Sequence, residues 1–214
     1  MSKSLADFLP EILPQVPGCG DLLAKNAVRN ALIEFCERTE VWRVELDPIM
    51  VVNGVSDYEL DPPDSKSVIW RVMNVSYDGM PIDPKTTDDL DAEKPGWRTE
   101  TGTPFAYFAK DIRRTLRLVY TPDADLVNGL VIEAALKPSK TATTVEDALF
   151  EEYFDDVAEG ALAKLFGIEN HPWSSAAKAK YHRDKFDTMI STFSVEGARH
   201  GTRAPLRTKP YYSL

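Results

Sequence analysis

The chain has 214 residues, of which 43% are hydrophobic and 28% charged, and its formal net charge is −9. This balance excludes a wholly disordered chain, and the acidic pI near 4.9 argues against a body that grips nucleic acid phosphates. No stretch approaches eighteen apolar residues, and acids and prolines interrupt the first twenty, so we expect no membrane span and no secretory signal.

Residues 1–40 are predicted to be helical. An ordered segment at Ser4 to Leu9 precedes a proline-rich linker, and Asp21 is the expected cap of a helix that runs to about Glu40. Its apolar residues recur every three or four positions, which is typical of a helix packed on one face. Cys36 belongs to this pattern and is expected to be a buried small hydrophobic residue, not a disulfide or metal ligand.

Residues 41–140 are predicted to form a small antiparallel β domain, because the period of the apolar pattern changes to two at Val41. Turn signals such as Asn53-Gly54, Asp78-Gly79 and Asn128-Gly129 separate short runs, which favours a sandwich or a partly open barrel. The stretch from Thr86 to Glu93 is either one helical turn or a solvated acidic loop.

Residues 141–196 are predicted to form a helical hairpin. Thr143 to Glu146 has the spacing of a capping box, and Ser174 or Ser175 is expected to cap a last helix that stops near Gly197. The fold class is therefore α+β: a bundle of the N-terminal helix and two C-terminal helices, with the β domain inserted and an extended arm at residues 197–214.

The chain contains none of the common catalytic or phosphate-binding motifs. His182 lies beside Arg183 on what the pattern indicates is the polar side of the last helix, so solvated surface charges explain it better than an acid/base or metal site. The acids between Asp83 and Glu93 lack the order of a calcium loop. We predict no enzyme activity, no cofactor and no metal.

Aromatic residues are frequent in the β region. Alternation predicts that Trp42, Trp70, Phe105 and Tyr120 belong to the core. Trp97, between Gly96 and Arg98 in an apparent loop, is predicted to be exposed and is the candidate for a contact with a partner.

Residues 197–214 differ from the rest of the chain. They carry a charge of +4 and contain no acid, which leaves −13 on residues 1–196. A basic segment with apolar residues at its end is typical of an arm that docks on another protein. The residues expected to dock are Arg199, Arg203, Leu206, Arg207, Lys209, Tyr211, Tyr212 and Leu214.

The order of the segments resembles the head-to-tail adaptor, or connector, proteins of tailed bacteriophages. The helix that ends in Phe35-Cys36-Glu37-Arg38-Thr39 and leads into Trp42 is similar to their N-terminus. The stretch Gly160 to Leu165 before Pro172-Trp173 looks like their closing helices, and Leu206 to Tyr212 is similar to their C-terminal arm.

This resemblance implies a homo-oligomeric ring, commonly of twelve copies, at the head-tail junction of a virion assembled in the host cytoplasm. The expected partners are the portal protein, a tail tube or nozzle protein, and double-stranded DNA that passes through the channel without specific contacts. The arm is expected to reach the portal, with neighbouring adaptor copies as the alternative. Two other hypotheses are a carbohydrate- or receptor-binding β module on a helical stalk and a metal-assisted hydrolase that uses Asp88 and Asp89.

Overall fold

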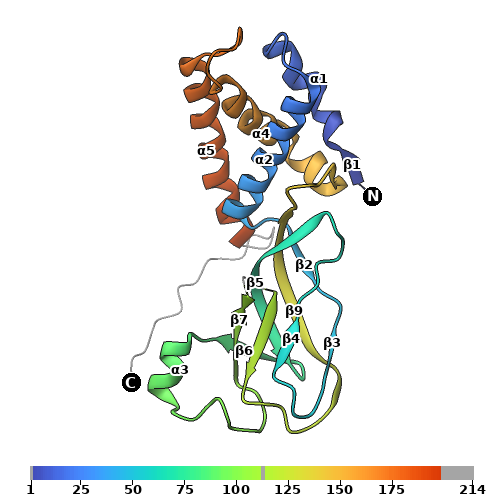
Figure 1. Cartoon of the computed structure of the whole chain (residues 1–214), viewed down its shortest axis with the longest axis vertical. Helices are drawn as coiled ribbons and strands as arrows, with labels where there is room; N and C mark the ends of the chain where they lie inside the picture. Colours follow the sequence, from blue (N-terminus) through green and yellow to red (C-terminus); the bar gives the residue numbers. More distant parts are fainter. Residues whose placement is uncertain (1, 112–113, 199–214) are drawn as a thin grey trace. The chain divides into compact units, whose positions relative to one another are not determined.

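The computed structural model describes residues 2–111 and 114–198. The chain divides into two compact units, which Figure 1 shows in the colours of the sequence. The helical unit combines Met1–Trp42 with the segment that begins at Pro138, and the β unit is Arg43–Lys137. Helices dominate the first unit and strands the second, so the predicted α+β class is confirmed.

The helical unit contains three long helices and several short elements. In chain order they are β1 (Ser2–Ser4), the 3-10 helix η1 (Leu5–Phe8), α1 (Leu9–Ile12), the 3-10 helix η2 (Leu13–Gln15), α2 (Asp21–Thr39), β10 (Thr144–Glu146), α4 (Asp147–Phe166) and α5 (Ala176–Ala198).

Helices α2, α4 and α5 pack against one another around an apolar core (Figure 1). The predicted apolar stripe of α2 is the buried one, since Val28, Leu32 and Phe35 are nearly inaccessible to solvent. Cys36 is fully buried as predicted, and burial raises the pKa of its thiol to about 12. It is therefore an inert core residue.

Two predicted helix caps are wrong. Asp21 is the first residue of α2, and Gly20 precedes it without a side-chain hydrogen bond. The supposed capping box at Thr143 to Glu146 is instead largely the strand β10, which pairs with β1 and so provides partners for its backbone groups. Of the two residues predicted to cap α5, Ser174 and Ser175, it is Ser175 whose Oγ accepts a hydrogen bond from the Lys178 amide, at 3.3 Å.

A glycine allows α4 and α5 to approach closely. A Cβ atom built on Gly160 would lie 2.7 Å from Cε2 and 2.9 Å from Cζ of Phe186, a side chain that is fully buried. The ring of Phe186 also faces Phe35 of α2, with centroids 6.3 Å apart. All three long helices therefore meet around this ring.

The β unit contains a curled sheet and one short helix. Its elements are β2 (Arg43–Glu45), β3 (Ile49–Val51), β4 (Asp57–Glu59), β5 (Ser67–Tyr77), β6 (Met80–Pro84), α3 (Thr87–Glu93), β7 (Ala106–Lys110), β8 (Thr115–Val119) and β9 (Leu126–Pro138), the last of which ends in the helical unit. The strand order is β2-β9-β5-β6-β7-β8-β4, and β3 also pairs with β9.

The prediction of a wholly antiparallel sheet is wrong at one position. Strands β6 and β7 are parallel, with Asp83 opposite Ala106 and Pro84 opposite Tyr107. Parallel neighbours require a crossover connection, and residues 85–105, which include α3, provide it. The alternation of apolar and polar residues indicates where strands lie, but not whether paired strands run parallel or antiparallel. The sequence pattern therefore could not predict the parallel pair.

The core of the β unit is built from the inward side chains of its strands. Leu116, Leu118, Leu130 and Ile132 are almost completely buried. The aromatic residues predicted for the core, Trp42, Trp70, Phe105 and Tyr120, are each only half-buried. Their prediction is therefore confirmed in part.

Candidate functional site

The predicted docking arm lies outside the described residues. This applies to all eight of its candidate contact residues: Arg199, Arg203, Leu206, Arg207, Lys209, Tyr211, Tyr212 and Leu214.

Trp97 was predicted to be exposed, and that prediction is wrong. Only 4% of the residue is accessible, because its side chain packs in a small core with Leu90, Ala106 and Val119. Its ring meets that of Phe108 edge-on, with centroids 5.5 Å apart. The indole Nε1–H donates to Asp91 Oδ1 at 2.8 Å. Trp97 thus anchors α3 to the sheet and offers no exposed contact surface.

The acidic stretch around α3 has a structural explanation. Thr86 and Asp89 form a reciprocal capping box at the start of α3, so the helical alternative is the one observed. Asp91 accepts from Trp97 and binds Arg98, while Lys85 donates to Glu93 at 2.8 Å. The spacing of Thr86 and Asp89 is the sequence signal of this helix. Among the described residues, no group of three or more His, Cys, Asp or Glu is placed to hold a metal ion.

The aromatic side chains of the β unit do not form an exposed platform. Each of those named above is buried or half-buried, and the ring of Trp70 has the Lys137 ammonium 4.5 Å from its centroid. Flat stacking on a sugar requires an exposed ring face. The partial burial of these rings therefore gives the carbohydrate-binding hypothesis little support.

His182 was predicted to be a solvated surface residue, and that prediction is also wrong. It is 7% exposed, stacks on Phe166 with centroids 5.2 Å apart, and its Nδ1 lies 2.6 Å from Glu159 Oε2. The Lys185 ammonium donates to the other oxygen of Glu159 at 2.9 Å. Burial opposes the charge on Glu159, but the hydrogen bonds from Lys185 and His182 outweigh it and lower the pKa of this carboxyl. The group is a contact between α4 and α5.

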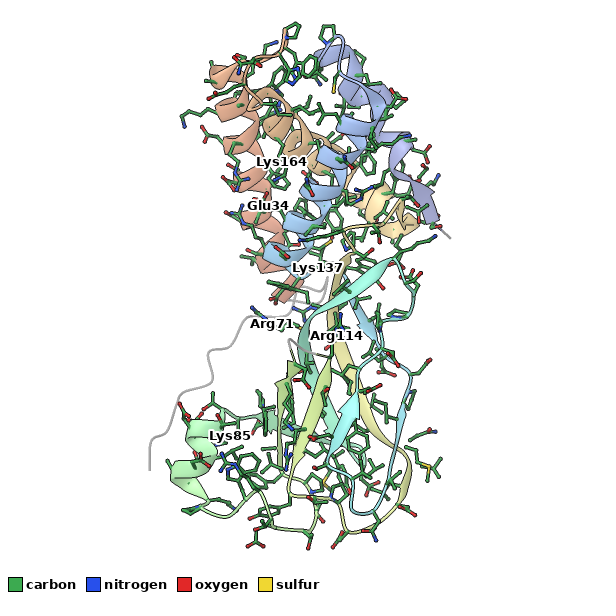
Figure 2. All side chains as sticks on the ribbon, viewed as in Figure 1. Glu34, Arg71, Lys85, Arg114, Lys137 and Lys164 are labelled. Atoms are coloured by element: carbon green, nitrogen blue, oxygen red, sulfur yellow. The ribbon has the colours of Figure 1, made fainter. Side chains whose placement is uncertain are left out.

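A second polar contact joins all three long helices. Glu34 of α2 accepts from Lys164 of α4 at 2.6 Å, and Figure 2 labels both side chains in the helical unit. The other Glu34 oxygen lies 2.6 Å from the guanidinium of Arg183 in α5, which also donates to Asp187 at 2.9 Å. Burial tends to raise the pKa of Glu34, but these partners outweigh it and lower the pKa. The network thus links α2, α4 and α5.

An open pocket in the β unit has mixed charge. It is lined by the acids Glu59, Asp61 and Asp111 and by the cations Arg114 and Lys137, the last two labelled in Figure 2. Opposite charges in similar number favour neither an anionic nor a cationic ligand. The pocket therefore indicates no particular chemistry.

Exposed apolar side chains gather instead at one end of the β unit, around the turns at residues 52–55, 78–79 and 122–129. We call this surface the apolar end and define it by Met50, Val52, Val55, Met80 and Val127. Met80 is 72% exposed and Val127 is 79% exposed. This surface could not be predicted from the sequence, because single exposed apolar residues in separate turns have no periodic signal.

Comparisons with known proteins give one result that covers both units. A protein-family model described as SU10 adaptor protein matches residues 4–209. No curated protein matches the chain. Within residues 2–111 and 114–198, no helix is long and apolar enough to cross a membrane.

Proposed function

Because the chain belongs to the SU10 adaptor protein family, a family of bacteriophage head-to-tail adaptors, we propose that it forms a ring between the portal and the tail. The ring has twelve copies and surrounds the path of the DNA in the virion. The observation that carries this proposal is the family match, which spans the helical unit and the β unit together.

The protein acts in this proposal as a structural part and not as an enzyme. Two polar clusters of the described residues suit that role, since Glu34 and Glu159 are each engaged in contacts between helices. Rigid contacts between helices suit a component that must hold its shape while DNA passes.

The charge of the body supports passage of DNA without binding. Residues 1–196 carry −13, and acidic surfaces repel phosphates. In the proposed ring, the acids that face the channel keep the DNA from adhering to the wall.

Residues 197–214 form the docking arm in this proposal. The portal and a neighbouring adaptor copy are the two candidate partners. With either partner, an acid-free segment that contains apolar residues docks on another protein of the assembly. Crosslinks from Tyr212 separate them by landing on the portal or on a second copy.

Electron microscopy of the purified full chain, alone and mixed with portal rings, tests the proposal. We expect rings with twelvefold symmetry that stack coaxially on the portal. A protein that stays monomeric and does not co-sediment with portal rings at any concentration would contradict the ring.

A chain that lacks residues 199–214 is the matched control. It should keep the circular dichroism of the full chain and lose co-sedimentation with portal rings. If the shortened chain still co-sediments with portal rings, the proposed docking role of the arm is contradicted, whereas the proposed ring is not.

A further inference from the structure

A shallow groove runs between α4 and α5 in the helical unit. Two small residues, Ala163 of α4 and Ala179 of α5, form its apolar part, and the cations Lys164, Lys180 and Arg183 line it. We call this surface the basic groove and define it by these five residues. The small side chains leave space that a larger apolar side chain of a partner can fill.

Cations are concentrated at the basic groove. Residues 178–185 contain four lysines or arginines and one acid, in a chain whose net charge is −9. Lys178 and Lys180 are exposed on either side of Ala179. The ion pair of Lys180 with Asp184 lies within α5 and is open to solvent, so it is weak. A partner that matches this groove is acidic and carries some apolar surface.

The opposite charge lies at the start of α4. Residues 146–156 contain six acids and no cation. Glu151, Glu152 and Asp155 are exposed, and we call this surface the acidic surface. Lys3 lies 3.4 Å from Glu151. Within the described ranges, neither Glu152 nor Asp155 has an ion-pair partner for its side chain, so both are available to another protein.

A kink in α4 places the acidic surface at the edge of the helical unit. Tyr153 has φ −125° and ψ 23°, which is outside helical geometry, so the residues before it leave the axis of the rest of α4. They lie beside β1, because β10 immediately precedes α4 and pairs with β1. Figure 1 shows β1 and α5 on opposite sides of the helical unit. The acidic surface and the basic groove therefore lie on opposite sides of one copy.

A closed ring of identical copies requires two such faces. Rotational symmetry brings one side of each copy against the other side of the next copy, so the two sides must complement each other. The basic groove and the acidic surface meet this requirement in charge. The half-buried rings of Phe150 and Phe154, which lie next to the acids in the sequence, supply the apolar surface that the groove lacks.

We propose that the basic groove of one copy binds the acidic surface of the next copy around the ring. The inference rests on the proposed adaptor function and assigns the two lateral faces of each copy. Glu152 and Asp155 face Lys178 and Lys180 across the contact. One such contact between exposed charges is weak, but a closed ring repeats it in every copy, so the copies hold one another cooperatively.

Charge reversal in the full chain tests the proposal. The groove variant carries Lys178→Glu and Lys180→Glu, and the acidic-surface variant carries Glu152→Lys and Asp155→Lys. All four side chains are exposed, so both variants should fold. Lys164 and Arg183 stay unchanged, because they bind Glu34 within their own copy.

Two lysines outside both surfaces provide the matched control. Lys66 and Lys140 are exposed, and Lys66→Glu together with Lys140→Glu changes the net charge by as much as the groove variant does. Circular dichroism and urea unfolding confirm that each variant is folded. Sedimentation velocity over a range of protein concentrations then measures ring assembly.

Each variant alone brings like charges together at every contact, so we expect its assembly to require at least about tenfold more protein than that of the native chain. An equimolar mixture of the two variants should assemble nearly as well as the native chain, because each reversed groove meets a reversed acidic surface. The proposed ring has an even number of copies, so the two variants can alternate around it. The control should assemble like the native chain.

Two results overturn the proposal. One is assembly of either variant at the concentration that the native chain needs. The other is a mixture that assembles no better than its components. A native chain that stays monomeric at every concentration also overturns it.

Co-sedimentation with portal rings tests the proposed function separately. If charge reversal leaves assembly unchanged while native rings bind the portal, the adaptor function stands and this inference falls. If the mixture restores assembly but no ring binds the portal, the inference stands and the proposed function falls.

Discussion

The contact between Gly160 and Phe186 gives a prediction with a definite sign. In Gly160→Ala the new methyl group would lie within 3.0 Å of three atoms of the Phe186 ring. This ring is fully buried and packs beside the ring of Phe35. Overpacking of this kind costs about 2 kcal/mol. Alanine gains about 1 kcal/mol over glycine from helix propensity. We therefore expect Gly160→Ala to lower the free energy of unfolding of the helical unit by about 1 kcal/mol.

The reasoning is tested in a second background. In Phe186→Leu the ring atoms that meet the methyl group are absent, so the same alanine substitution should raise stability by about 1 kcal/mol. Urea unfolding followed by circular dichroism at 222 nm measures both values, and the double-mutant cycle gives a coupling of about 2 kcal/mol. If the substitution has the same effect in both backgrounds, the ring does not limit the approach of α4 and α5, and the reasoning is refuted.

Three other substitutions test further features. Asp156 of α4 is 8% exposed, and burial together with the charges of Asp155 and Glu159 raises the pKa of its carboxyl. Its negative charge therefore lowers stability at neutral pH. Asp156→Asn should raise the urea midpoint of unfolding at pH 7, and this gain should shrink as the pH falls toward the ordinary pKa of aspartate. The pKa of Glu34 is lowered, so its contribution is present at neutral pH and is lost as the pH falls through that lowered pKa. Glu34→Gln should cost about 1 kcal/mol at pH 7 and little at a pH well below the ordinary pKa of glutamate, and equal losses at both would contradict the ion network. Trp97→Ala should destabilise the β unit by about 3 kcal/mol or more in thermal unfolding, because the side chain is buried in a small core. A variant that keeps its stability but binds its partner less well would instead indicate that Trp97 is an exposed contact residue.

Periodicity was the reliable part of the sequence. The repeat of three and four residues from Leu23 to Cys36 predicted both the helix and its buried face, because burial of an apolar stripe is what stabilises such a helix. The change of period at Val41 predicted strands, and Arg43 begins the first strand of the β unit.

The failures concern contacts between different elements of the fold. His182 occupies a polar position on α5, yet α4 covers it and supplies Glu159 as its partner. Trp97 follows a glycine in a loop, yet α3 carries Leu90 and Asp91 to it. The direction of β7 relative to β6 depends on the same crossover. None of these follows from the local pattern, since each is decided by how another segment of the chain packs.

The β unit is joined to the helical unit by strands that are themselves neighbours. Its first strand, β2, pairs with the last part of β9, with Arg43 opposite Ala135. The chain therefore leaves and re-enters the helical unit through two hydrogen-bonded neighbouring strands, which form a stem for the inserted sheet. Such a stem lets evolution lengthen, shorten or replace the inserted sheet while the helices that it interrupts keep the same pair of attachment points. A helical frame with an exchangeable insert can thus meet different partners without redesign of its own packing.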